Sequence, residues 1–350
     1  MNRTRSVGIR DLARELQMSI STVSRAMNSR GEVSAETRAL VVSTAERIGY
    51  TPNQSGRSLR HGTTDTVALV MPTSTARTES GETFFLNISD ALQEVLSPAG
   101  LNLTILPYGS SENRENFLIK VVDRHLADAV ILADTQIVDP RIDYLLQRKV
   151  PFVSLGRTRA GGHSWLDLDV ENAARQSVDR LVLLGHRRIA LGRSDRQVNS
   201  TALFVEAYRH RLEDHGIEYD PALIFPVSDH RGGGFDLGTK LLEMADCPTA
   251  IMLELETLAI GLYSRLRESG REPGIDIAVT GFRVNPVLEL LSPALTAFEF
   301  DLRGYGHMLG GLVLAELANA GGSPLLACEL WPMQLLIGES DHPPIRIFGE

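Results

Sequence analysis

The sequence predicts an all-α three-helix head joined by a short linker to an α/β body of two doubly wound parallel-sheet subdomains. Two observations predict this fold class. The first fifty residues carry apolar residues at helical spacing, whereas the chain after Gly62 alternates short β-branched runs with amphipathic stretches. A chain of 350 residues, of which 43% are hydrophobic, is also long enough for two or three compact domains.

Charge is unevenly distributed along the chain. Residues 1–62 hold ten arginines and five acidic residues, a net charge of +5, whereas residues 63–350 carry −14 within the chain total of −9. A phosphate backbone attracts the first segment and repels the second, so the sequence predicts that nucleic acid is held at one end only. A solvated basic face on a helical cap is the alternative interpretation.

Cysteine usage and hydropathy indicate a cytoplasmic protein that does not enter a membrane. The two cysteines, Cys247 and Cys328, are too few for a disulfide framework or a zinc site of their own. The charged N-terminus has no apolar core of a signal peptide, and the apolar run near residues 308–318 is shorter than the ~20 residues that span a bilayer. We expect neither a metal nor a cofactor.

Three helices are predicted in the head. The segment 9–16 places its apolar residues on one helical face, and Ser19 is positioned to cap a second helix that continues to Met27. Ser34 is positioned to cap a third helix, which Gly49 ends. Two short helices separated by a tight turn are typical of a helix-turn-helix, whose second helix enters the major groove of DNA.

Four motifs of the head follow one another in register: Ile9-Arg-Asp-Leu-Ala13, Ser21-Thr-Val-Ser-Arg-Ala-Met-Asn28, Val33-Ser-Ala-Glu-Thr-Arg38 and Gly49-Tyr-Thr-Pro-Asn53. Together they resemble the N-terminal signature of LacI/GalR-type transcription regulators. The resemblance implies that double-stranded DNA is the partner. It places Ile20, Ser21 and Arg25 at base edges and Ser19, Thr22, Ser24 and Asn28 at phosphates, with Asn53, Arg57 and Leu59 as further DNA contacts.

Two of these residues have specific expected roles. The guanidinium of Arg25 can pair with O6 and N7 of guanine, although a surface arginine on a helix is the alternative. Ile20 favours contact with a thymine methyl group because it has no polar atom to offer.

Residues 51–62 form the linker and are too few for a stable isolated helix, because isolated helices shorter than ~12 residues are marginal in water. The resemblance implies a hinge helix that folds in the minor groove beside its dimer mate, with Leu59 as a wedge that kinks the duplex. Simple linker packing is the alternative for Leu59. Gly56 stands where the family usually has alanine and costs about 1 kcal/mol in a helix, so we expect this hinge to melt easily.

The body is predicted to contain two halves. Strands at 66–71, 101–106, 129–132 and 152–155 alternate with helices at 84–99, 113–126 and 139–148 in the first half, and strands at 188–192, 224–227, 250–253 and 276–280 alternate with helices at 200–215, 234–245 and 256–269 in the second.

The body also resembles this family, in Leu184-Gly-His-Arg-Arg-Ile-Ala-Leu191, Ala259-Ile-Gly261 and Leu295-Thr-Ala297. The resemblance implies a periplasmic-binding-protein-like effector domain over residues 63–340. Its expected limits are 63–160 plus 285–320 for the first half and 161–284 plus 321–340 for the second, after a DNA-binding domain at 1–50 and before a tail at 341–350.

In this fold a small ligand lies between the halves, at the carboxyl ends of the parallel strands. Carried over position by position, the resemblance implies a set of cleft residues: Ser74, Phe84, Phe85, Tyr108, Asp134, Arg157, Trp165, Asn199, Phe204, Glu256 and Arg283. The two phenylalanines have an alternative role as core residues, because Phe84 shares helical spacing with Ile88 and Leu92.

Three departures from the family leave the ligand class open. Relatives usually have arginine at Phe204, Asn-Asp at Leu255-Glu256 and aspartate at Arg283. One reading is a carbohydrate held by Asp134, Glu256 and Asn199, and the other is an anionic ligand clamped by Arg157 and Arg283. We favour a carbohydrate or sugar derivative, and an arginine that pairs with a neighbouring acid would remove the motive for the anionic reading.

No catalytic motif is present: the glycine-rich segments do not continue into a phosphate loop, and no nucleophile elbow occurs. We therefore expect a transcription regulator, preferentially a repressor, that binds a pseudo-palindromic site as a homodimer and responds to a small effector. The tail has no leucine heptad, so a dimer is favoured over a tetramer. The alternatives are a small-molecule-binding protein without specific DNA reading and a carbohydrate-active enzyme.

Overall fold

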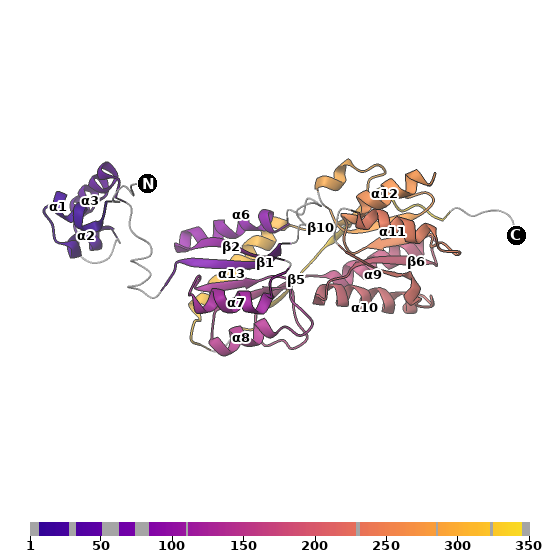
Figure 1. Cartoon of the computed structure of the whole chain (residues 1–350), viewed down its shortest axis with the longest axis horizontal. Coiled ribbons are helices and arrows are strands. Elements are labelled where there is room, and N and C mark those ends of the chain that lie inside the picture. The colour runs from indigo at the N-terminus through magenta and orange to yellow at the C-terminus, as the bar shows by residue number, and fades with distance from the viewer. Residues whose placement is uncertain are drawn as a thin grey trace. The chain divides into compact units, whose positions relative to one another are not determined.

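The computed structural model describes residues 7–27, 33–50, 63–73, 84–109, 111–228, 232–284, 286–322 and 325–344. The chain divides into two compact units, Met1–Asp65 and Thr66–Glu350 (Figure 1). This division lies three residues beyond the boundary expected from composition. None of the described helices combines the length and the apolar character that crossing a membrane requires.

The head contains the three predicted helices, α1 (Ile9–Glu15), α2 (Ile20–Met27) and α3 (Ala35–Ile48). Both predicted serine caps are present, because the Ser19 hydroxyl accepts the Thr22 N–H at 3.0 Å and the Ser34 hydroxyl accepts the Thr37 N–H at 3.2 Å. One small core joins the helices: Leu12, Ala13, Val23, Ala26, Val41 and Ala45. Gly49 ends α3 in the left-handed conformation with φ 67°, as a glycine after a helix commonly does.

Several predictions fall on segments outside the described residues. They are the hinge helix with Gly56, the DNA contacts at Asn28, Asn53, Arg57 and Leu59, the cleft residue Ser74, and the end of the tail after Pro344.

The first sheet of the body is parallel throughout, with the order β11-β5-β4-β3-β1-β2. Its strands are β1 (Thr66–Thr73), β2 (Asn102–Gly109), β3 (Ala129–Leu132), β4 (Phe152–Leu155), β5 (Trp165–Leu168) and β11 (Cys328–Trp331). Its helices are α6 (Phe84–Leu96), extended by η1 (Ser97–Ala99), then α7 (Arg114–Asp123), α8 (Pro140–Arg148) and α13 (Leu302–Ala318).

Alternation along β1 shows why helices cover both faces of this sheet. Val67 and Leu69 pack in one cluster with residues of α6 and α13, whereas Ala68 and Val70 pack in another with residues of α7 and α8 (Figure 1). A strand that is apolar on both faces needs a helical layer on each side, and this is the doubly wound arrangement.

The second sheet has the order β12-β10-β9-β8-β6-β7 and is parallel except for β12. Its strands are β6 (Ile189–Ser194), β7 (Ile224–Val227), β8 (Ala250–Leu253), β9 (Ala278–Arg283), β10 (Thr296–Glu299) and β12 (Gln334–Leu336). Its helices are α9 (Val170–Leu183), α10 (Asn199–Asp214), α11 (Gly233–Leu242) and α12 (Leu258–Glu268), with the short turns η2 (Pro221–Leu223) and η3 (Pro286–Leu290).

The sheet order differs at three strands from the limits expected for the halves. β5 and β11 belong to the first sheet although their residues were assigned to the second half, and β10 belongs to the second sheet although it was assigned to the first. The chain therefore passes between the sheets three times, after β5, after β10 and after β11. These crossings join the halves beside the ends of their strands.

Candidate nucleic-acid interface and ligand cleft

One face of α2 is exposed on the head and carries the described residues that the sequence assigned to DNA. Ser19, Ile20, Ser21 and Arg25 are exposed, and Thr22 and Ser24 are half-buried. The opposite face of the helix is buried in the core of the head. The core thus fixes the orientation of α2 while this exposed face, which we call the α2 face, remains available.

The chemistry of the α2 face suits a DNA groove. Its hydroxyl groups can donate to phosphate oxygens, and the Arg25 fork can reach two acceptors of one guanine. Ile20 leaves 42% of its surface exposed. Such a residue is available for contact with a thymine methyl group.

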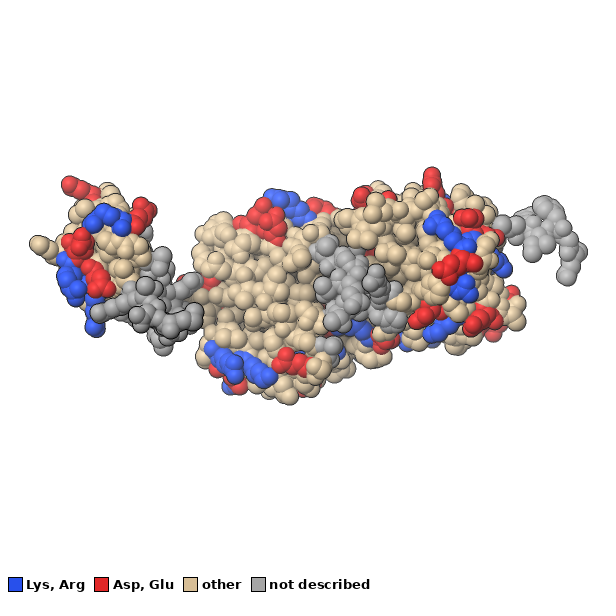
Figure 2. Space-filling view, turned by 45° about the horizontal axis from the view of Figure 1, so that its top comes forward, with Lys and Arg blue, Asp and Glu red and all other residues tan. Residues whose placement is uncertain are grey.

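The described part of the body shows no broad basic patch on the face drawn in Figure 2. There, lysine and arginine side chains of its described part lie among aspartate and glutamate side chains instead of forming a broad patch. Ion pairs also occur on the body, as in Arg303 with Glu94 at 2.6 Å and Arg148 with Asp123. The body surface seen here is therefore electrostatically mixed, in agreement with its net negative charge.

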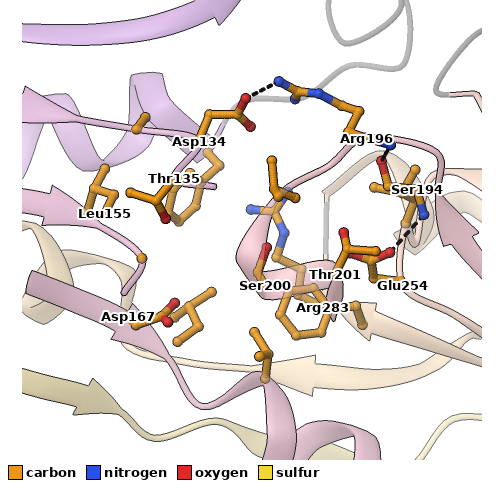
Figure 3. Close-up of a pocket in the computed structure, with 18 of the residues that line it drawn as sticks. Asp134, Thr135, Leu155, Asp167, Ser194, Arg196, Ser200, Thr201, Glu254 and Arg283 are labelled. Carbon is orange, nitrogen blue, oxygen red and sulfur yellow. Dashed lines mark hydrogen bonds and ion pairs between the residues drawn. The ribbon is translucent and has the colours of Figure 1, made fainter. Parts of the chain in front are cut away.

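A cavity of about 200 Å³ lies between the two halves of the body, at the carboxyl ends of strands from both sheets. Five residues assigned to the ligand by sequence line it: Phe84, Phe85, Asp134, Glu256 and Arg283. Further polar residues line it that the sequence did not single out as ligand contacts, among them Thr135, Asp167, Ser194, Arg196, Ser200, Thr201 and Glu254 (Figure 3).

Arg283 is paired inside the cleft. Its Nη2 lies 3.1 Å from Oε1 of Glu256, and its guanidinium stands 4.9 Å from the centre of the Phe84 ring. Glu256 is 3% exposed, so both charges of this pair are largely withdrawn from water. An arginine held by its neighbour no longer indicates an anionic ligand, and the first motive for that reading is removed.

Arg157 does not line the cleft, contrary to the sequence prediction. It forms ion pairs with Glu171 and, at 3.5 Å, with Asp167, and it lies 5.8 Å over the ring of Trp165. The pairing and stacking hold the guanidinium behind the cleft wall. The proposed clamp of Arg157 and Arg283 is therefore not formed in this structure.

Other predicted ligand residues also lie behind the cleft wall. Tyr108 packs against Phe117 in the cluster that α7 and α8 cover, and Phe204 packs edge-on against Phe282, which itself lines the cleft. Trp165 supports Arg157 from β5. Tyr108 follows the expected strand and Phe204 belongs to the expected helix, but both side chains point into the core.

Asn199 has a different role from the predicted ligand contact. Its backbone N–H donates to the Thr135 carbonyl at 2.9 Å, and its Nδ2 donates to the Arg157 carbonyl at 2.8 Å. Asn199 begins α10 in the second half, whereas both carbonyls belong to the first. It therefore joins the two halves beside the cleft.

A second contact crosses the cleft. Arg196 of the second half forms an ion pair with Asp134 of the first (Figure 3). Asp134 follows β3 in the left-handed conformation with φ 64°, and Nη2 of Arg141 donates to its carbonyl at 2.9 Å. Arg141 is fully buried and pairs with Asp139 at 2.7 Å, so this pair fixes the turn that presents Asp134.

Two cleft carboxyl groups have raised pKa values. Burial raises the pKa of Asp167 to about 6, although the backbone N–H and charge of Arg157 act in the opposite direction. Burial also raises the pKa of Glu254, which accepts hydrogen bonds from the Ser194 N–H at 2.7 Å and from the Thr201 hydroxyl. These groups can accept hydrogen bonds from a hydroxyl-bearing ligand.

The aromatic pair serves both alternatives that the sequence left open. Phe84 and Phe85 line the cleft, and Phe84 also packs against Phe85 at 5.2 Å and Tyr305 at 6.0 Å between ring centres. The cleft therefore has an aromatic wall that is continuous with the core of the first half.

Most of the missed cleft residues could have been found from strand ends. Glu254 comes directly after β8, and Thr135 follows β3 by three residues. Ser194 ends β6, which extends two residues beyond its predicted end, so Arg196 follows it closely. Gly156, directly after β4, has φ 98°, and a Cβ there would lie 2.6 Å from the Thr135 hydroxyl, so the cleft wall requires glycine at this position.

Comparison with known proteins places the two units in one family. The family description "Bacterial regulatory proteins, lacI family" matches residues 8–53, and "Periplasmic binding protein-like domain" matches residues 178–340. The chain is 30% identical to the HTH-type transcriptional regulator RafR of Escherichia coli, over 97% of this chain and 99% of that protein. It is 28% identical to AglR of Rhizobium meliloti, over 96% and 95% of the two chains.

Solved structures show the same fold. The complex of the transcriptional regulator CelR with cellobiose has a TM-score of 0.72 and 26% identity, over 95% of this chain and 99% of that one. The lac repressor dimer bound to operator and the anti-inducer ONPF has a TM-score of 0.83 at 20% identity, over 97% and 100%. The chain therefore belongs to the lacI family of bacterial regulatory proteins and is a DNA-binding transcription regulator.

Proposed function

We propose that this regulator acts as a homodimer in the cytoplasm, preferentially as a repressor, and reads a pseudo-palindromic operator through the α2 face of each head. The observation that carries this proposal is the α2 face itself, where Arg25 and Ile20 are exposed beside hydroxyl groups. A single three-helix head offers few base contacts, so specificity requires two heads related by two-fold symmetry. The relative solved with its operator is likewise a dimer.

Base reading by Arg25 is tested with Arg25→Ala on an operator selected from random duplexes. We expect the substitution to cost ~1–3 kcal/mol of binding free energy on the best duplex and to relax the preference at one base position. Binding of single-base variants of that duplex measures both effects. Arg14→Ala, which removes a side chain that is 80% exposed on α1, is the matched control because it deletes the same charge from the head.

A loss of equal size on every duplex would show that Arg25 meets only phosphate. In that case both Arg25→Ala and the Arg14→Ala control would keep the base preference of the wild type. If Arg25 reads a base, the control retains the base preference of the wild type.

We further propose that the cleft binds a neutral carbohydrate or sugar derivative as effector, and that it binds this molecule without transforming it. Arg283 and Arg196 are each paired with a carboxylate, whereas Glu254 and Asp167 present acceptor oxygens beside an aromatic wall. Acceptors for hydroxyl groups and an aromatic face suit a sugar ring better than an anion. The relative CelR was solved with cellobiose.

The effector class is tested with a panel of neutral sugars and their sugar acids, measured by calorimetric titration of the full chain. We expect a neutral sugar to bind and the corresponding sugar acid to bind more weakly, because the cleft carboxylates repel the negative charge of the acid. Glu254→Gln should weaken the best sugar by about tenfold, since the amide keeps only one of the two acceptor oxygens. Glu268→Gln, exposed at the end of α12, is the control.

Tighter binding of the sugar acid would reverse the proposed ligand class. Equal affinity of Glu254→Gln and wild type would remove Glu254 from the contact set.

A further inference from the structure

A second cavity lies outside the ligand cleft, against one side of α10. Its volume is about 380 Å³. The turn after β6 and successive turns of α10 form its main walls, and Ile137 and Tyr219 complete it. We call it the α10 cavity.

Three arginines line the α10 cavity: Arg193 at the end of β6, Arg196 in the following turn, and Arg209 on α10. Glu206 is the one carboxylate among its described lining residues. The cavity therefore has an excess of positive charge, although the body as a whole is acidic.

Arg193 and Arg209 differ from other arginines nearby in that they form no ion pair with a described carboxylate. Arg211 on the same helix is paired with Asp179 at 2.7 Å, and Arg188 before β6 is paired with Asp220 at 3.2 Å. Within the described ranges, no carboxylate lies within ion-pair distance of Arg193 or Arg209, although the charge of Arg193 acts to lower the pKa of Glu254. Arg193 instead donates to the Ser194 carbonyl at 2.6 Å, and Arg209 contacts the ring of His210 at 3.0 Å.

We propose that the α10 cavity binds a small organic molecule that carries a phosphate group. The three arginines come from β6, the turn after it and α10, and guanidinium groups match a phosphate, which has several acceptor oxygens and two negative charges. Beside Gln197 and Thr201, the remaining walls are formed by Ile137, Val198, Ala202, Val205 and Tyr219, so the phosphate is attached to a compact, mainly apolar or ring-shaped portion.

Occupation of the α10 cavity is coupled to the cleft through Arg196. This residue lines both cavities, and its guanidinium pairs with Asp134 across the halves. A phosphate beside Arg196 competes with Asp134 for the same cation and weakens that contact. The phosphate-bearing molecule therefore favours a state of the body in which the contact between Arg196 and Asp134 is broken. Any effect of this molecule on transcription rests on the proposed function.

Binding is tested by calorimetric titration of the full chain with phenyl phosphate, with phenol as the neutral probe of the same ring. The test variant is the double substitution Arg193→Ala with Arg209→Ala. The control is the double substitution Arg187→Ala with Arg271→Ala, which removes two exposed arginines of the second half that do not line the cavity.

We expect wild type and control to bind phenyl phosphate with equal affinity, phenol to bind far more weakly, and the test variant to lose at least about tenfold in affinity. Equal affinities of test and control variants would overturn the site, because binding would then follow net charge alone. Absence of binding to wild type would overturn it as well.

Coupling is tested separately with Asp134→Asn, which releases Arg196 from its partner. We expect this variant to bind phenyl phosphate several-fold more tightly than Asp143→Asn, which removes an exposed carboxylate of α8 in the same half. Equal affinities of these two variants would overturn the coupling. None of these titrations contains DNA or sugar, so their failure is distinguishable from failure of the proposed function.

Discussion

At the scale of single residues, charge pairing decides which cleft side chains can meet a ligand. The sequence places Arg283 and Asp134 at strand ends, and the structure brings both to the cleft. The sequence does not reveal that Arg283 forms an ion pair with Glu256 or that Asp134 forms one with Arg196, because these partners come from separate loops. Strand position can be predicted from local apolar patterns, whereas an ion pair depends on the packing of several elements.

The same limit explains the misplaced ligand residues. Tyr108, Arg157 and Phe204 lie at or near the expected strand and helix ends, but each points away from the cleft. Phe204 stands where the family resemblance implies an arginine, and it turns into the core against Phe282, as an apolar side chain should. The identity of a residue therefore predicts its environment better than its alignment with a ligand-binding position does.

Asp167 gives a pH-dependent prediction. Its carboxyl group has a pKa of about 6 in the folded chain against a usual value of 3.8, so the folded state binds its proton more tightly than the unfolded state. The penalty for the buried charge is absent below pH 3.8, grows as pH rises to 6 and is constant above it. We expect Asp167→Asn to raise the free energy of unfolding by up to about 3 kcal/mol at pH 8.

Urea unfolding from pH 4 to pH 8 measures this difference. Asp90→Asn, at an exposed position on α6, is the control and should show no such pH-dependent gain. A gain for Asp167→Asn that is independent of pH would assign the effect to packing instead of ionisation.

At the scale of elements, the ends of several apolar strands were predicted correctly. The strands after which the chain crosses between the two sheets were not predicted. Strands 129–132, 152–155, 224–227 and 250–253 match β3, β4, β7 and β8 at both ends. By contrast, β5, β10, β11 and β12 were not predicted as strands: β5 carries Asp167, and β11 and β12 are short and largely exposed. β5 also pairs with β11, and β10 with β12, which are strands distant in sequence that a local pattern cannot show.

The N-terminal cap of α2 gives a prediction at this scale. The Ser19 hydroxyl accepts the Thr22 N–H, so Ser19→Ala removes the cap and should cost about 1 kcal/mol of local helix stability. Hydrogen exchange of α2 amides should then accelerate by about fivefold. Ser43→Ala on α3 is the control, since its hydroxyl donates only to the Leu40 carbonyl within the helix.

Unchanged exchange in Ser19→Ala would mean that core packing alone sets the start of α2. Acceleration in both variants would point to a general loss of head stability.

At the scale of the whole molecule, three chain crossings join two sheets that meet around the cleft. The halves are held together there by Asn199 with the Thr135 and Arg157 carbonyls, and by Arg196 with Asp134. A ligand can shift this arrangement only if it binds the closed and open states with different affinity. The charge division between a basic first segment and an acidic remainder was predictable from the sequence, and so were the two halves.

The most direct measurement is the operator affinity of the full chain with and without the neutral sugar that binds the cleft most tightly. We expect saturating sugar to change the operator dissociation constant by at least about fivefold, and the operator to change the sugar affinity by the same factor. An operator affinity that stays the same at saturating sugar would contradict control of DNA binding from the cleft.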